Sequence, residues 1–328
     1  MSRPFKIRDI LADKGTKVIG SLTIENSDTA SVKLTVGIIN GLEEGPVLCL
    51  TGGMIGTHYP GINACIRIFN EIEPKKLKGT LITTPVMNMP AFQRGMDGSP
   101  IDDLSLVASY AYSVFPGDPD GTITRRIAYV VFNEIIKKSQ YHLDLRGGDL
   151  IENILIFVYS FETGNKSFDD VTKAMIKAMD IDYYVNVPEG RGSLVGEANK
   201  AGTHSIVLIG SKGLGTFDEE EVERCMNGLY NMLKHLKMIS GKTETSLEPK
   251  QLKFDLQMIK AKQGGLLYLK CSCGDLVSVG QNLGCIKDLT GKVLQELLSP
   301  IDGVLDFIRP SHIIQPGNLI IGIRQILG

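Results

Sequence analysis

The strongest constraint on the fold is the alternation of apolar, strand-like runs with helical segments between residues 17 and 250. Runs such as GTLITTPV and THSIVLIG are nearly continuously apolar, which is typical of strands in a sheet covered on both faces. The expected strands cover residues 21–25, 31–39, 46–52, 79–86, 141–147, 154–160, 182–187 and 203–210. Apolar residues at helical spacing predict helices over 60–73, 122–138 and 217–237. The sequence therefore predicts an α/β domain with helices on both faces of its sheet.

A change of composition predicts a second, smaller domain. The polar stretch GKTETSLEPKQL (241–252) lacks periodicity and suits a linker, and short glycine-broken strands follow it. We therefore expect an α/β domain over 1–245 and an all-β, barrel-like domain over 252–328. The segments GDLVSVGQ and SPIDGVLDF look like half of a biotinyl or lipoyl barrel. No lysine occupies a carrier context at a hairpin tip, so we expect a structural or lid-like module.

Charge and hydropathy exclude several classes of partner. Lys and Arg total 35 against 37 Asp and Glu, without long blocks of either sign, so nucleic acid is not an expected partner. The chain has no run of eighteen apolar residues and no secretory signal at its N-terminus, which predicts a cytoplasmic protein that does not interact with membranes. No cofactor is expected, and homo-oligomerisation stays open.

Functional residues are expected where the central strands end, because ligands of α/β sheets bind at the carboxyl ends of strands. The stretch LTGGMIGTHYPG follows one such strand, and its glycines allow a tight turn that exposes backbone N–H groups at a helix start. In YHLDLRG, the side chains of His142, Asp144 and Arg146 share one face of a strand. His142 lies furthest from the strand end and is interpreted as a core residue.

Five motifs in order carry a resemblance to a known family. They are GGMIGTHYPG, NMPAFQRGMDGSPID, SVFPGDPDGTITRRIA, YHLDLRGGDLIEN and THSIVLIGSKG. Together with the final β module they resemble the succinylglutamate desuccinylase/aspartoacylase family, relatives of the zinc carboxypeptidases, over about residues 30 to 325. The resemblance implies a carboxypeptidase-like α/β fold with a mixed sheet, and deacylation of a small amino-acid-derived substrate by zinc.

The residues that hold zinc in that family are replaced. The resemblance assigns the three ligand positions to Ile55, His58 and Arg146, where relatives carry two histidines and a glutamate. Isoleucine has no lone pair, and arginine does not normally deprotonate. Zinc needs three lone-pair donors from the protein, so we expect no metal at the usual place.

Other positions with assigned roles in the family have also changed. Leu208 stands where relatives carry the glutamate that activates water, and Asp97 stands where they carry an oxyanion-stabilising arginine. Tyr112 and Ser113 replace the asparagine and arginine that grip a substrate carboxylate, after an insertion in this chain. Relatives place a metal ion near an arginine, whereas this chain has the cation Arg146 at a metal-ligand position and the anion Asp97 at the arginine position.

These changes lead to a set of candidate residues with open roles. We expect Arg146 to occupy part of the metal space and to pair with Asp97 or Asp144, because an unpaired buried guanidinium is costly. Arg146 then either binds a ligand carboxylate or phosphate, or plugs an inactive site. His58 is interpreted as an acid/base group, a weak metal ligand or a hydrogen-bonded structural histidine. The candidate catalytic residues are His58, Arg146, Asp144 and Asp97, and the candidate substrate-binding residues are Gly56, Tyr112, Ser113, Asp149 and Glu152.

Three functions remain open at this stage. The first is an enzyme that acts on a small amino-acid-derived carboxylate or amide without metal, using His58 as acid/base and Arg146 as electrophilic clamp. The second is a noncatalytic protein that uses the cleft for ligand sensing or for assembly with an active homologue. The third is a zinc-dependent deacylase with ligands recruited from His58, Asp144 or Asp149.

Overall fold

The structure is a computed structural model that describes residues 4–27, 30–98, 114–188, 192–246 and 248–327. Within these ranges the helices are α1 (Tyr59–Glu71), α2 (Met89–Arg94), α3 (Ile123–Val130), α4 (Lys166–Ala178), α5 (Leu194–Lys200) and α6 (Glu219–His235), with the short turns η1 (Pro74–Lys76), η3 (Val131–Ile135) and η4 (Ile136–Lys138). None of these helices combines the length and apolar character needed to cross a bilayer.

The strands of the N-terminal and central parts are β1 (Phe5–Ile7), β2 (Ile10–Ala12), β3 (Thr16–Ser27), β4 (Ala30–Asn40), β5 (Glu43–Thr51), β6 (Lys78–Thr84), β7 (Tyr141–Arg146), β8 (Asn153–Ile154), β9 (Phe157–Phe161), β10 (Tyr183–Val187) and β11 (His204–Ile209). The C-terminal strands are β12 (Lys250–Lys260), β13 (Gly265–Leu269), β14 (Leu276–Val277), β15 (Asn282–Lys287), β16 (Val293–Leu298), β17 (Gly303–Ile308), β18 (Ile313–Ile314) and β19 (Leu319–Ile326).

One large mixed sheet organises the described part of the chain. Its strand order is β14-β17-β19-β12-β10-β9-β11-β7-β5-β6-β4-β3, with β8 paired to β17. Strands β11, β7, β5 and β6 run parallel to one another, whereas β9 is antiparallel to β11 and parallel to β10. Parallel strands with helical connections place their carboxyl ends at the same edge, and this edge carries the candidate site.

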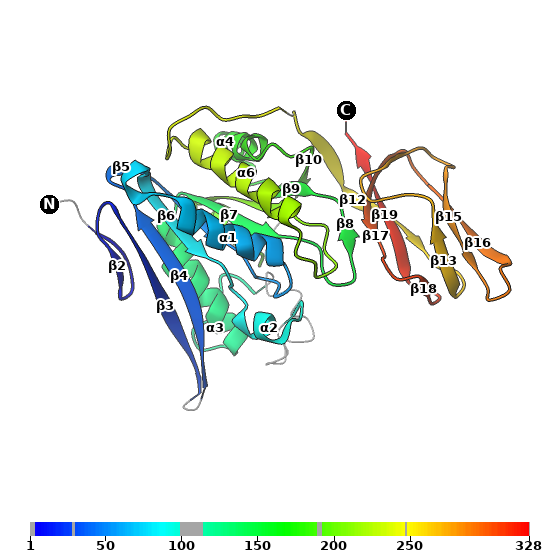
Figure 1. Ribbon diagram of the computed structural model, residues 1–328, viewed down its shortest axis with the longest axis horizontal. Coiled ribbons are helices and arrows are strands. Elements are labelled where there is room, and N and C mark those ends of the chain that lie inside the picture. The colour runs from blue at the N-terminus through cyan, green and yellow to red at the C-terminus, as the bar shows by residue number, and fades with distance from the viewer. Residues whose placement is uncertain (1–3, 28–29, 99–113, 189–191, 247, 328) are drawn as a thin grey trace.

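Helices cover both faces of the sheet (Figure 1). Leu143 and Leu145 of β7 belong to the apolar cluster that packs under α1, α4 and α6. The alternate β7 residues His142, Asp144 and Arg146 face the other way, toward the side that α3 and α5 cover. Strand β7 is therefore buried on both faces but apolar on one face only. Its other face carries the polar side chains of the site.

The fold agrees with the predicted α/β class and with most of the predicted elements. The helices expected at 60–73 and 217–237 are α1 and α6. The helix expected at 122–138 begins as α3, continues in the wider turn η3 and ends in the tighter turn η4. Strand 154–160 is divided between β8 and β9. The sequence analysis missed α2, α4 and α5, although the apolar residues of α4 recur at helical spacing.

The C-terminal segment combines two sheets. Strands β13, β15, β16 and β18 form a four-stranded antiparallel sheet, as expected for a small β module. Strands β12, β14, β17 and β19 instead extend the large sheet, and β12 pairs in parallel with β10 of the α/β region. The module is thus continuous with the sheet that carries the site.

Helix α1 approaches β7 closely because its third residue, Gly61, has no side chain. A Cβ atom built on Gly61 would lie 2.7 Å from the carbonyl oxygen of Leu145, a backbone atom that cannot move aside. We expect Gly61→Ala to lower the free energy of unfolding by about 1–3 kcal/mol through overpacking. Urea unfolding checks this, with the exposed Asn70→Ala in the same helix as a control. Equal stability of the two variants would contradict the packing argument.

Candidate functional site

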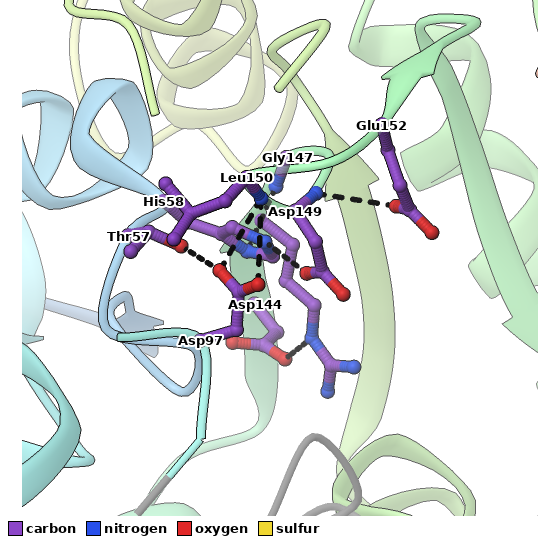
Figure 2. A network of polar contacts seen from close by, with 9 residues as sticks. Thr57, His58, Asp97, Asp144, Gly147, Asp149, Leu150 and Glu152 are labelled. Carbon is purple, nitrogen blue, oxygen red and sulfur yellow. Dashed lines mark hydrogen bonds and ion pairs between the residues drawn. The ribbon is translucent and has the colours of Figure 1, made fainter. Parts of the chain in front are cut away.

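The candidate site lies where the parallel strands β5 and β7 end. The turn after β5 carries His58, and the loop after β7 carries Asp149 and Glu152 (Figure 2). The two segments contact each other directly, because the Gly147 amide donates a hydrogen bond to the His58 ring. The polar residues that the sequence assigned to separate motifs are thereby brought together.

A buried ion pair stands at the centre of the site. The Arg146 Nε donates to the Asp144 carboxylate at 2.5 Å, and the two residues are 6% and 0% exposed. The expectation that Arg146 is buried and paired with Asp97 or Asp144 is confirmed for Asp144. Because Nε bonds to a residue two positions earlier in the same strand, the Arg146 side chain runs back along β7 toward Asp144.

Asp144 is held by hydrogen bonds from the neighbouring strands. The Thr51 hydroxyl donates to Asp144 Oδ1 at 2.8 Å, and its oxygen lies 2.9 Å from Nε2 of His142. Nδ1 of His142 lies 2.6 Å from the Ser205 hydroxyl. Because a carboxylate only accepts hydrogen bonds, Thr51 donates to Asp144, Nε2 of His142 donates to Thr51, and the Ser205 hydroxyl donates to Nδ1 of His142. The fully buried His142 is a core residue, as the sequence predicted, and also part of this chain.

His58 uses both ring nitrogens within the protein. Nδ1 accepts the hydrogen bond of the Gly147 amide at 3.0 Å, so this nitrogen carries no proton. Nε2 lies 3.0 Å from Asp149 Oδ1 and donates to it (Figure 2). The side chain is 2% exposed. This geometry favours the interpretation of His58 as a structural histidine that joins the two loops.

Asp97 also joins the two loops. Its carboxylate accepts hydrogen bonds from the Thr57 hydroxyl and, at 3.4 Å, from the Leu150 amide. Its backbone oxygen accepts from the Gly56 amide at 3.3 Å. A Cβ on Gly56 would lie 2.5 Å from backbone atoms of α2, so this glycine is required for packing. Asp97 and Gly56 therefore shape the turn that carries His58.

Asp149 and Glu152 of the loop after β7 are linked by a backbone hydrogen bond and interact electrostatically. The Asp149 amide donates to Glu152 Oε2 at 3.2 Å, and both side chains are partly exposed (Figure 2). Burial, together with the negative charge of Asp149, raises the pKa of Glu152 to about 7. Glu152 therefore exchanges a proton near neutral pH, a property that the sequence does not reveal.

The residues at the zinc positions do not fit the metal that the family resemblance implies. Ile55 has no donor atom, the Arg146 guanidinium has no lone pair, and both His58 nitrogens are engaged. Leu208 is fully buried in the cluster under α1, α4 and α6, on the sheet face opposite to Asp144. Among the described residues, no three His, Cys, Asp or Glu side chains are grouped as a metal ion requires.

Most of the candidate residues meet at this edge of the sheet. His58, Asp97, Asp144, Asp149 and Glu152 lie around the junction of the two loops. Arg146 is bound to Asp144. The candidates Tyr112 and Ser113 lie outside the described residues. Sequence reasoning missed Thr51 and Ser205, although both are polar residues inside apolar strands, which is a usable signal for a buried hydrogen-bond partner.

Comparisons with known proteins extend the resemblance. A model of the succinylglutamate desuccinylase/aspartoacylase catalytic domain matches residues 44–236. The chain is 28% identical over 325 residues to a Halomonas elongata protein named N-alpha-acetyl-L-2,4-diaminobutyric acid deacetylase, covering 93% of this chain and 90% of that protein.

Solved structures show the same fold. The product-bound ectoine utilization protein EutE (DoeB) of Ruegeria pomeroyi superposes with a TM-score of 0.84 at 22% identity, covering 98% of each chain. A succinylglutamate desuccinylase from a Silicibacter species gives a TM-score of 0.85 at 22% identity, over 99% of this chain and 98% of that one. The predicted fold class is confirmed, including the C-terminal β strands.

The buried His142 predicts a pH dependence of stability. Burial is the main cause that lowers the pKa of His142 from 6.5 to about 4 in the folded protein. The unfolded chain therefore binds more protons between these values, so this contribution to stability is present above pH 6.5 and is lost as the pH falls toward 4. The full loss is about 3 kcal/mol.

Urea unfolding at several pH values in this window, for the protein and for His142→Gln, measures the contribution. We expect the free energy of unfolding to fall more steeply with acidity in the unsubstituted protein than in the variant. Parallel curves for the two proteins would show that His142 does not control this dependence.

Proposed function

The chain belongs to the succinylglutamate desuccinylase/aspartoacylase family, and from that membership we propose that it binds a small amino-acid-derived carboxylate through Arg146, without zinc-dependent hydrolysis. The family consists of deacylases, and the Halomonas relative is named for an N-acetylated amino acid. An N-acetylated amino acid with a free α-carboxylate carries a planar anionic group. A guanidinium matches such an anion with two parallel hydrogen bonds.

The observation that carries this proposal is the orientation of the Arg146 side chain. Its Nε–H is bound to Asp144, and Asp144 is in turn held by Thr51. An arginine anchored in this way has lost most of its rotamer freedom before a ligand arrives, which lowers the entropy cost of binding. The low exposure of the pair also strengthens its electrostatic interactions with a ligand.

The absence of zinc chemistry is the second part of the proposal. Activation of water would require a metal or a general base next to the substrate. In the described residues, the position of the family's glutamate is the core residue Leu208, and His58 has no nitrogen available for proton transfer in this geometry. We propose that the protein retains the ligand without cleaving it.

One observation favours metal-free hydrolysis as a second candidate function. Glu152, with a pKa raised to about 7 by burial and by Asp149, has the acid strength suited to a general acid or base at neutral pH. In this candidate, Arg146 polarises the acyl group or holds the carboxylate, and Glu152 transfers the proton. Turnover that persists in the presence of a chelator and is lost in Glu152→Gln would favour this candidate.

Calorimetric titration of N-acetyl amino acids and of their deacetylated counterparts tests the proposal. We expect saturable binding of at least one member of this set, with an affinity that falls about tenfold or more in Arg146→Lys. Lysine keeps the charge next to Asp144 but offers no planar pair of donors. Arg67→Lys, a surface arginine paired with Glu219 and Glu223, is the matched control and is expected to bind normally.

Metal analysis and assays of hydrolysis complete the test. We expect no stoichiometric zinc in the purified protein and no amide cleavage by the protein, with or without added zinc. One tightly bound zinc ion per chain, together with cleavage that a chelator abolishes, would overturn the proposal and establish a zinc deacylase with a shifted metal site.

A further inference from the structure

Tyr159 of β9 lies in the same row of the sheet as the buried ion pair. Thr51 pairs with Asp144, Asp144 pairs with Val207, and Val207 pairs with Tyr159. Residues directly opposite one another on neighbouring strands point to the same face. Tyr159 therefore projects on the face that carries Asp144 and Arg146, separated from Asp144 by a single strand.

The geometry of Arg146 directs its guanidinium toward this row. Arg146 itself is in register with Ile209, two residue pairs closer to the strand end than Asp144, and Ile209 pairs with Phe157. Its Nε nevertheless bonds to Asp144, so the side chain runs back over the Asp144 row. Two strand spacings, about 10 Å, separate the backbones of Asp144 and Tyr159. The long side chains of Arg146 and Tyr159 can together span this distance above Val207, which lies between them on β11.

The electrostatics of Tyr159 agree with this placement. Burial raises the pKa of the phenol, and the charges of Arg146 and Asp144 act on it in opposite directions. The hydroxyl consequently keeps its proton at neutral pH. A protonated phenol is a hydrogen-bond donor, and one close enough to feel the charge of Arg146 can donate to an anion that Arg146 binds.

The ring of Tyr159 is held in place, whereas its hydroxyl lacks a partner among the described residues. The ring packs between Phe157 and Phe161, with centroid distances of 6.1 and 5.9 Å. No described residue forms a hydrogen bond with the hydroxyl, although the side chain is only partly exposed. Tyrosine hydroxyls in such surroundings normally have a partner, so an oriented donor is available for a ligand.

We propose that Tyr159 contacts the ligand, with its hydroxyl donating a hydrogen bond to the carboxylate that Arg146 binds. This inference rests on the proposed function. It assigns to Tyr159 the discrimination between a free carboxylate and its neutral amide or ester. The neutral forms accept hydrogen bonds more weakly and leave the pair of donors incompletely satisfied.

The test is Tyr159→Phe, which removes one oxygen atom and leaves the ring packing intact. We expect the dissociation constant for the N-acetyl amino acid to rise about tenfold, as for the loss of one hydrogen bond to a charged group. The preference for the free acid over its primary amide should shrink by a similar factor. The midpoint of thermal unfolding should not change, because no described protein group depends on the hydroxyl.

Tyr141→Phe is the matched control. Tyr141 is the first residue of β7, at the opposite edge of the sheet, where its ring stacks on His204. We expect this variant to bind the acid and its amide like the unsubstituted protein.

The outcomes separate this inference from the proposed function. If Tyr159→Phe binds as tightly as the unsubstituted protein while Arg146→Lys is weakened, the inference is wrong and the proposed function stands. A loss of affinity accompanied by a lower unfolding midpoint assigns the hydroxyl to the fold and also overturns the inference. If none of the N-acetyl or free amino acids binds, both proposals fail.

Discussion

The buried ion pair of Asp144 and Arg146 is the constraint on which the rest of the site depends. A carboxylate or guanidinium removed from water is tolerated only when it is paired and hydrogen-bonded. Asp144 meets this requirement through Arg146 and Thr51, and Thr51 is oriented in turn by His142 and Ser205. A shift of β5 by one residue would replace Thr51 opposite Asp144 with Leu50 or Gly52, and a shift of β11 would move Ser205 away from His142. The ion pair and the strand register therefore support each other.

The two loops above the sheet are joined by a second set of polar contacts. His58 links the turn after β5 to Gly147 and Asp149, and Asp97 links the same turn to Leu150. In relatives, a zinc ion ties these segments together, according to the resemblance. In this chain, hydrogen bonds between side chains and backbone amides connect them. The site is therefore preorganised by the protein itself, which suits binding of a preformed anion.

The C-terminal β module contributes to the same frame. The Leu155 amide donates to the Asp306 backbone oxygen at 2.8 Å, and the Arg324 guanidinium lies 5.7 Å from the centre of the Phe157 ring. Phe157 packs in turn on Tyr159. The module thus contacts Phe157, and its removal would disturb the aromatic residues of β9. Its strands β12 and β19 continue the large sheet rather than forming a separate barrel.

Sequence periodicity was sufficient to predict the α/β class, helices α1 and α6, most central strands and the shared face of His142, Asp144 and Arg146, because alternation and helical spacing depend only on residues close in the chain. The family resemblance placed Arg146 in a buried pocket, and the cost of an unpaired buried guanidinium then predicted that it would be paired. Only the tertiary structure decided that its partner is Asp144, that both nitrogens of His58 are occupied, and that Tyr159 lies in the Asp144 row. These contacts join atoms from strands and loops far apart in the chain, and their existence depends on strand order and register, which no local pattern specifies.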